Sequence, residues 1–145
     1  MRLSAIQNAR VIYVMTHDSI GLGEDGPTHQ PIEHIQSLRL MPNMQVFRPA
    51  DAIETAECWA LAIKRSDGPS TLALTRQNLP PVRDDVSVNL CEKGAYRLKA
   101  AEGDKRVALV ATGSEVSLAM DVAAKLEAAG VGADVISMPC AELFD

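Results

Sequence analysis

Residues 16–31, THDSIGLGEDGPTHQP, form the stretch around which the rest of the chain is organised. The apolar run 11–15 before it predicts a strand buried on both faces, and the helical spacing of apolar residues after it predicts a helix over 32–40. Open α/β folds place ligands at polar loops of this kind, and glycines let the backbone bend closely around them. The residues alone leave two interpretations open: a ligand-binding loop, or an ordinary surface loop with solvated charges.

The rest of the chain alternates apolar runs with helical patterns. Further strands are expected at 44–48, 71–75, 94–100, 106–111 and 133–137, and further helices at 1–10, 52–65 and from Thr112 to Gly130. The run 106–111 is typical of another buried strand. Two β-α-β steps in succession predict parallel strands joined by right-handed crossovers. The fold class is therefore α/β, with β-α-β units of parallel sheet.

Several residues indicate where helices begin and end. Pro31 fits a first helical turn because proline lacks the N–H that would be unpaired there. The pairs Asp51 with Glu54 and Thr112 with Glu115 resemble capping pairs, whose side chains satisfy free backbone N–H groups. The inward faces are expected to carry these apolar residues: Leu3, Ile6, Ala9; Ile32, Ile35, Leu38; Ile53, Ala56, Ala60, Ile63; Val116, Ala119, Val122, Ala123, Leu126.

Residues 80–93 are the candidate linker, since they contain a Pro-Pro pair, several charges and no firm period. We expect two incomplete domains on either side, at 1–79 and 94–145. Neither end carries the cap or closing element of a finished fold, so we expect an internal segment of a longer protein. An isolated half-sheet leaves edge strands unpaired, and such a chain gains stability by pairing with another.

The composition excludes several classes of protein. The net charge of −5 argues against a nucleic-acid surface, which needs a basic field. The chain has no run of about 18 apolar residues that would span a membrane and no clear signal peptide. Cys58, Cys91 and Cys140 are widely spaced, so we expect small buried thiols rather than disulfides. A reducing cytoplasm fits this pattern best.

The string THDSIGLGEDGPTHQPIE resembles the pyrimidine-binding domain of transketolase. The resemblance continues through SLRLMPNM, VFRPAD, TLALTRQN and ATGSEVSLA, in the order of that family. It implies that 1–79 are the second half of the pyrimidine-binding domain and 94–145 the first half of the transketolase C-terminal domain. It further implies an enzyme that moves a two-carbon ketol unit from a ketose phosphate to an aldose phosphate. The implied cofactors are thiamine diphosphate and Mg²⁺ (or Ca²⁺), and the implied setting is a cytoplasmic homodimer of the pentose phosphate pathway.

The resemblance assigns roles to four residues. His17 and Asp25 would bind substrate, His17 near the sugar phosphate and hydroxyls and Asp25 at the hydroxyl beside the donor carbonyl carbon. His29 would be catalytic and cofactor-binding, over the thiazolium edge, where an imidazole can relay protons. Arg76 follows a strand at its C-terminal end, and its guanidinium would hold the substrate phosphate. Without the family, each has an ordinary explanation: a structural histidine, a solvated acid or a surface salt bridge.

The chain carries these residues without cofactor machinery of its own. The family activates the cofactor with a glutamate on the aminopyrimidine ring, whereas no acid precedes Asp18 here. The sequence has no GDG motif with a following Asn, and we assign no metal ligand. The turn 112–115 is expected to cap its helix rather than to bind an anion. We therefore expect the 145-residue chain alone to be inactive.

Two alternatives stay open at this point. A related thiamine diphosphate enzyme, such as deoxyxylulose-phosphate synthase or a 2-oxo acid dehydrogenase subunit, shares the domain order and an ATGSE-like turn. The GEDGPTHQP string with a following TRQN favours transketolase over these. The other alternative is a free-standing, non-catalytic module that binds a sugar phosphate or a partner protein.

Overall fold

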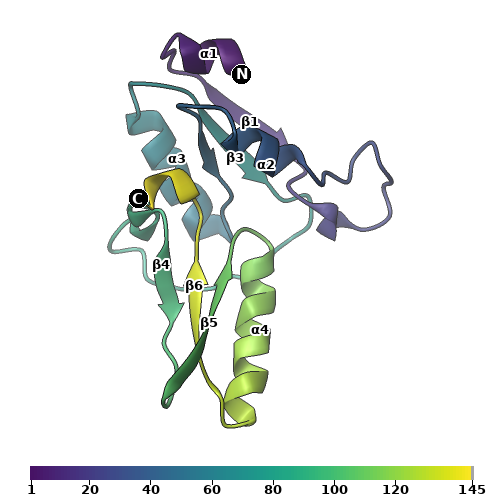
Figure 1. Cartoon of the computed structure of the whole chain (residues 1–145), viewed down its shortest axis with the longest axis vertical. Helices are drawn as coiled ribbons and strands as arrows, with labels where there is room; N and C mark the ends of the chain where they lie inside the picture. The colour runs from purple at the N-terminus through teal and green to yellow at the C-terminus, as the bar shows by residue number, and fades with distance from the viewer. Residues whose placement is uncertain (145) are drawn as a thin grey trace.

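The computed structural model describes residues 1–144 of the chain. Two sheets of three strands lie along its long axis, one in each half (Figure 1). We call residues 1–79 the first half and residues 94–144 the second half. Strands and helices alternate along both halves, which confirms the predicted α/β class.

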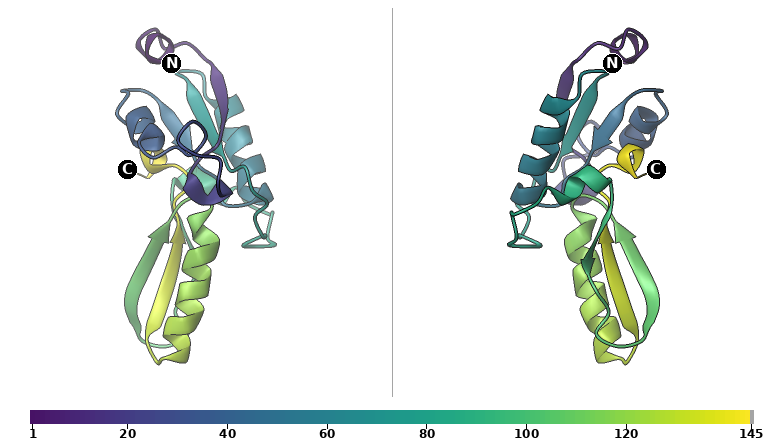
Figure 2. Two further views of the ribbon diagram at one scale, coloured as in Figure 1. Left: turned by 90° about the vertical axis from the view of Figure 1, so that its right-hand side faces the viewer. Right: turned by 90° about the vertical axis from the view of Figure 1, so that its left-hand side faces the viewer.

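The first sheet contains β1 (Ile12–Thr16), β2 (Gln45–Phe47) and β3 (Ser70–Leu74). All three strands are parallel, in the order β1-β3-β2, as two β-α-β steps require. The intervening helices are α2 (His34–Arg39) and α3 (Ala52–Lys64). They lie on opposite sides of the sheet (Figure 2).

Successive side chains of β2 enter these two layers, because side chains alternate across a strand. Val46 packs with Leu38 of α2, whereas Phe47 packs with Cys58 of α3 and Leu72 of β3. The first sheet is therefore the middle layer of three.

The second sheet contains β4 (Tyr96–Lys99), β5 (Lys105–Ala111) and β6 (Gly132–Ser137), in the order β4-β6-β5. Strand β5 is parallel to β6, and α4 (Glu115–Ala128) connects them and packs on both. Strand β4 is antiparallel to β6, so the prediction of parallel units holds for β5-α4-β6 and not for β4.

The two halves share one hydrophobic core. Its buried members include Cys58 of the first half, Cys91 of η2 (Leu90–Lys93) and Cys140, which precedes η3 (Ala141–Leu143). The C-terminal segment thus returns to the first half after β6 (Figure 1). All three cysteines are buried free thiols, as predicted.

The prediction of strands buried on both faces is wrong for β1 and β5. Each is the outer strand of its sheet, and Val14, Met15, Val107 and Val110 are exposed. Apolar runs do identify these segments as strands, but the runs cannot tell a central strand from one at the sheet edge.

The first two helices are shorter than predicted. Helix α1 spans Arg2–Ile6 only, and Leu3 and Ile6 are exposed. Helix α2 begins at His34, so Pro31 lies before it, and Ile32 is 84% exposed. Leu38 is buried as predicted. The loop before α2 is held by hydrogen bonds of Gly26 with His29 and Gln30, and the helix begins only after these residues.

The predicted inward face of α3 is also wrong. Ala56, Ala60 and Ile63 are exposed, and Ile53 is only half-buried. The buried residues are instead Glu54, Glu57, Cys58 and Ala62. Two glutamates face inward because they find hydrogen-bond partners in the linker and the second half, which a helical pattern does not reveal.

The helix ends give mixed outcomes. The Asp51–Glu54 pair is confirmed, since Glu54 N donates to Asp51 Oδ1 at 2.8 Å. The Thr112–Glu115 pair does not cap α4: Ser114 precedes that helix without a side-chain cap, and both other side chains contact Arg48. Gly130 ends α4 as predicted, with φ of 78°. Its N–H donates to Glu127 O, and the Val131 N–H donates to Leu126 O, which is a Schellman motif.

The helices of residues 1–144 are each too short or too polar to cross a membrane.

Candidate functional site

The carboxyl edge of the first sheet carries the predicted site residues. Thr16 of β1 pairs with Leu74 of β3, so His17 and Arg76 follow neighbouring parallel strands at one edge. Open α/β sheets bind ligands at this edge. Residues 17–33, between β1 and α2, form what we call the β1–α2 loop.

The loop brings three of the four predicted residues together. His17 Nε2 lies 3.9 Å from Asp25 Oδ2, and the His17 and His29 ring centroids are 5.6 Å apart. The 3.9 Å separation is an ion pair only when His17 is protonated, and too long for a hydrogen bond. The His17 side chain is 15% exposed and that of Asp25 53%, so the carboxylate stays available to solvent or a ligand.

The Gln30 side chain forms hydrogen bonds with the backbone of this loop. Its Oε1 accepts from Gly26 N at 2.9 Å, and its Nε2 donates to Gly23 O. The backbone N–H groups of His29 and Gln30 both donate to Gly26 O at 3.1 Å. Gly23 and Gly26 have φ of 112° and 79°, which side-chain-bearing residues rarely adopt. No role was assigned to Gln30 from sequence.

The loop and the end of β1 enclose a hollow of about 400 Å³. His17 and His29 line it together with His34, to which no role was assigned from sequence. The remaining lining residues are Thr16, Pro27, Thr28, Gln30 and Pro31. Hydrogen-bonding side chains predominate in this wall, which suits a polar ligand.

Arg76 lies at the same sheet edge but outside this hollow. It is exposed and forms no ion pair with any residue in the described range. Its neighbours Thr75 and Gln77 each keep a buried side-chain oxygen without a hydrogen-bond partner in residues 1–144. A Cβ added to Gly21 would lie 2.8 Å from Gln77 Nε2, so the β1–α2 loop closely approaches the segment after β3.

The described residues do not provide a complete site for thiamine diphosphate. No three His, Cys, Asp or Glu side chains within 1–144 come together in a way that could hold a metal ion. Residues 1–144 therefore offer no metal-ligand cluster of this kind for the diphosphate end of the cofactor.

A second set of charged residues joins the loop to the second half. Arg48, which follows β2, donates from Nε to Asp18 Oδ2 at 2.9 Å and forms an ion pair with Glu115. Its guanidinium also donates to Thr112 O at 3.1 Å and to Ser114 Oγ at 3.4 Å. We call these five residues the Arg48 network. No role was assigned to Arg48 from sequence, although a charge within the mostly apolar segment 45–50 could have indicated it.

These contacts determine two pKa shifts in opposite senses. Burial alone would lower the pKa of Arg48, but hydrogen bonding to Glu115 and attraction by Asp18 and Glu115 outweigh it and raise that pKa. Burial alone would raise the pKa of Glu115, but the hydrogen bond and charge of Arg48 lower it overall. The charged forms of both groups are therefore favoured.

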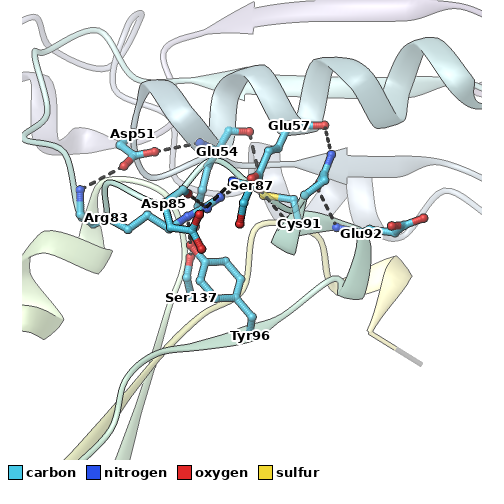
Figure 3. A network of polar contacts seen from close by, with 12 residues as sticks. Asp51, Glu54, Glu57, Arg83, Asp85, Ser87, Cys91, Glu92, Tyr96 and Ser137 are labelled. Carbon is cyan, nitrogen blue, oxygen red and sulfur yellow. Dashed lines mark hydrogen bonds and ion pairs between the residues drawn. The ribbon is translucent and has the colours of Figure 1, made fainter.

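A further network, shown in Figure 3, joins α3 to the linker and the second half. Glu54 Oε1 accepts from Tyr96 Oη at 2.8 Å and from Ser137 Oγ at 2.5 Å, and Glu54 Oε2 accepts from Ala50 N. Arg83 donates to Tyr96 Oη at 3.1 Å and pairs with Glu57. We call Glu54, Glu57, Arg83, Tyr96 and Ser137 the Glu54 network.

Burial dominates the electrostatics of the Glu54 network. It raises the pKa of Glu54 despite hydrogen bonds from Ser137, Ala50 and Tyr96 that favour the charged form. Burial and the negative charge of Glu54 also raise the pKa of Tyr96. This network is far from the histidines in sequence, and we assign it a structural role.

Comparison with known proteins identifies the family. Residues 1–82 match the family described as "Transketolase, pyrimidine binding domain", and residues 94–145 match "Transketolase-like TK C-terminal domain". Transketolase 2 of Xanthobacter flavus is 56% identical over 146 residues, covering 100% of this chain and 21% of that protein.

Solved structures agree with the sequence comparison. A Pichia stipitis transketolase mutant in complex with fructose 6-phosphate has a TM-score of 0.92 and 49% identity. A second mutant structure from that organism, in complex with xylulose 5-phosphate, has the same TM-score and identity. Each match covers 99% of this chain and 21% of the other.

This chain therefore spans about a fifth of the length of the relatives it matches. The matches favour transketolase over the related thiamine diphosphate enzymes, and transketolases depend on that cofactor. The fold, the loop and these likenesses lead to one assignment: the chain belongs to the transketolase family, and its first 82 residues belong to the pyrimidine-binding domain.

Proposed function

We propose that the β1–α2 loop and Arg76 form the sugar-phosphate-recognition edge of a transketolase active site. The polypeptide that contains this edge would transfer a two-carbon ketol unit from a ketose phosphate to an aldose phosphate. One observation supports this above all: His17, Asp25 and His29 converge in one loop at the carboxyl edge of a parallel sheet. The complexes of transketolase relatives with fructose 6-phosphate and xylulose 5-phosphate support the substrate class.

Each loop residue has a role that its chemistry suits. His17 and His29 donate hydrogen bonds to sugar hydroxyls, with His29 nearer the thiazolium edge of the cofactor. Asp25 accepts a hydrogen bond from the hydroxyl beside the donor carbonyl carbon. A sugar with the wrong stereochemistry would leave that carboxylate unpaired, which gives selectivity.

Arg76 holds the phosphate of the sugar. An exposed guanidinium without an internal partner can grip a phosphate through two hydrogen bonds. The residues on either side of it in the sequence, Thr75 and Gln77, each keep a buried side-chain oxygen without a hydrogen-bond partner in residues 1–144. The sugar would then extend from the histidines toward the end of β3.

Carbon–carbon bond cleavage is chemistry that thiamine diphosphate supplies, so the role of this chain is to recognise and orient the sugar. Apart from His29, the residues that bind the cofactor with Mg²⁺ or Ca²⁺ would lie outside these 145. We further propose a homodimer, a place in the pentose phosphate pathway and a cytoplasmic location. The 145-residue chain alone is expected to have no ketol-transfer activity.

A segment exchange tests this proposal. The 145 residues replace the matching segment of the X. flavus enzyme, with which they align from end to end. We expect the chimera to transfer ketol units from xylulose 5-phosphate. Asp25→Ala should lower its kcat/KM by about 10–100-fold, the cost of losing a hydrogen bond to a charged group.

Two results would contradict the proposal. One is a folded chimera that binds cofactor and transfers nothing. The other is tight binding of fructose 6-phosphate by the isolated chain without cofactor, which would favour a non-catalytic binding module instead.

A further inference from the structure

Arg48 has an unusual position for a residue outside the β1–α2 loop. It follows β2 at the sheet edge that carries the site, and its side chain is 8% exposed. Its guanidinium lies between Asp18 of the loop and Glu115 of α4. A guanidinium donates in several fixed directions, so one arginine can connect two chain segments at once.

On one side, Arg48 contacts the beginning of the loop. Asp18 directly follows His17, its side chain is 2% exposed, and its carboxylate pairs with Arg48. A buried carboxylate without a partner is costly, so this pairing fixes the backbone next to His17.

Further contacts continue from Asp18 into the loop. Ser19 Oγ donates to Asp18 Oδ1 at 3.3 Å and accepts from Gly21 N at 3.2 Å, within η1 (Ile20–Leu22). Gln30 then contacts the carbonyls of Ile20 and Gly23 and the N–H of Gly26. An unbroken series of contacts therefore connects Arg48 with the neighbour of His29.

On the other side, the turn before α4 fits around Arg48. Gly113 N donates to Arg48 O at 3.0 Å, and Thr112 and Ser114 supply oxygens to the arginine. Gly113 has φ of 57°, and a Cβ there would lie 2.8 Å from Arg48 Cγ and Nε. The turn binds an arginine of the first half, which explains why Thr112 and Glu115 do not cap α4.

A purely structural role is the simplest alternative for this arginine. The Glu54 network already joins the two halves, without contacting the β1–α2 loop. The Arg48 network is the one that contacts Asp18 and thus the loop. Holding the halves together therefore does not account for where Arg48 lies.

We propose that Arg48 is a positioning residue for the sugar-binding β1–α2 loop. The turn 112–115 of the second half binds its guanidinium and holds it in place. The second half would then act on sugar binding without touching the sugar. This inference rests on the proposed function, since it assumes that the loop binds the sugar phosphate.

The chain offers a matched control in Arg65. Its side chain is 9% exposed, and it pairs with Asp67 at 2.9 Å. It also donates to Pro69 O at 2.6 Å and to Asn43 O at 3.0 Å. These partners lie before β3 and β2, at the opposite edge of the sheet. Arg65→Met thus removes a comparably buried and bonded arginine without affecting the loop directly.

The kinetic test uses the X. flavus chimera with xylulose 5-phosphate. Arg48→Met should lower kcat/KM by about 100-fold, since small misplacement of a site has costs of that order. Arg65→Met should change it by less than about threefold, as for a distant independent site. Arg48→Lys should recover only part of the loss, because an ammonium cannot bridge Asp18 and the turn together.

A second readout does not depend on activity. In the 145-residue chain, the Hε1 protons of His17 and His29 should give NMR signals distinct from each other and from that of His34. Arg48→Met should move both toward unstructured positions, and Arg65→Met should leave them in place. If Arg48→Met fails to fold, Glu115→Gln replaces it, since it removes the charge that pairs with Arg48 from the second half and keeps both Arg48 and Asp18.

The outcomes separate the two proposals. An unsubstituted chimera that folds, binds cofactor and transfers nothing would overturn the proposed function, and the NMR signals would still test the role of Arg48. An active chimera in which Arg48→Met resembles Arg65→Met, in both rate and histidine signals, would overturn the positioning role. Full recovery by Arg48→Lys would show that charge alone suffices, which contradicts the bridging geometry.

Discussion

The two polar networks that join the halves differ in what they bury. In the Glu54 network a fully buried carboxylate accepts hydrogen bonds from the hydroxyls of Tyr96 and Ser137. In the Arg48 network a guanidinium lies between two carboxylates, and the Glu115 side chain is 46% exposed. The groups that donate to Glu54 in the first network are uncharged. The second network consists of charged partners and borders the β1–α2 loop.

This difference has a physical consequence for the two glutamates. Burial raises the pKa of Glu54, while Arg48 lowers the pKa of Glu115. The Glu54 network therefore makes its carboxyl easier to protonate than an ordinary glutamate, and the Arg48 network makes Glu115 harder to protonate. The first network connects the two halves, and the second, which contacts Asp18, is the one that we propose to position the loop.

The largest expected effect comes from removing Glu54. Glu54→Ala leaves the Tyr96 and Ser137 hydroxyls and the Ala50 N–H without their acceptor. We expect the free energy of unfolding to fall by about 3–5 kcal/mol, the cost of several buried unsatisfied groups. Urea denaturation of the 145-residue chain measures this. Tyr96→Phe, which removes one of the three donors to Glu54, should cost about 1 kcal/mol. An equal loss in both variants would contradict the account, because the other two hydrogen bonds of Glu54 would then contribute nothing.

A smaller effect is expected at Asp18. Asp18→Asn keeps the shape of the side chain but removes the charge opposite Arg48. We expect a loss of about 1.5–3 kcal/mol in the free energy of unfolding, typical of a charge-assisted hydrogen bond. The same denaturation experiment applies, with Glu33→Gln as an exposed control. A variant as stable as the unsubstituted chain would mean that the buried pair contributes nothing net, as some buried pairs do.

The smallest effect is a difference in pH dependence. A raised pKa in the folded state adds stability below the ordinary glutamate pKa of about 4.3, and this stability is lost as the pH rises. A lowered pKa adds stability above that value, which is lost as the pH falls. Relative to Glu54→Gln, the unsubstituted chain should therefore lose stability with rising pH. Relative to Glu115→Gln, it should gain.

Denaturation between acid and neutral pH checks these opposite slopes. Glu115 is half exposed, so its slope should be the shallower of the two because solvent screens its charge. Slopes of the same sign would contradict the contrast between the networks.

The sequence sufficed for features that depend on neighbours along the chain. The α/β class, the Asp51–Glu54 pair and the end of α4 at Gly130 all follow from local patterns, and the structure confirms them. The loop that holds His17, Asp25 and His29 was also located from sequence. Their roles stay predictions, as do the domain boundaries at 79 and 94.

Features that depend on distant partners were missed. Glu54 faces inward because Tyr96 and Ser137, far along the chain, donate to it. Thr112 and Glu115 fit a capping box by spacing, but both side chains contact Arg48 instead. In both cases a buried charge overrides a local pattern, because leaving it unpaired would cost more than a lost cap.

Amide hydrogen exchange in the 145-residue chain tests the central contrast most directly. Gly26, His29 and Gln30 donate hydrogen bonds inside the β1–α2 loop, so their exchange rates report its order. We compare Arg48→Met with Glu54→Gln, at denaturant concentrations that give both variants equal global stability. The account predicts faster exchange of the three loop amides in Arg48→Met than in Glu54→Gln. Equal rates in the two variants would show that Arg48 does not position the loop.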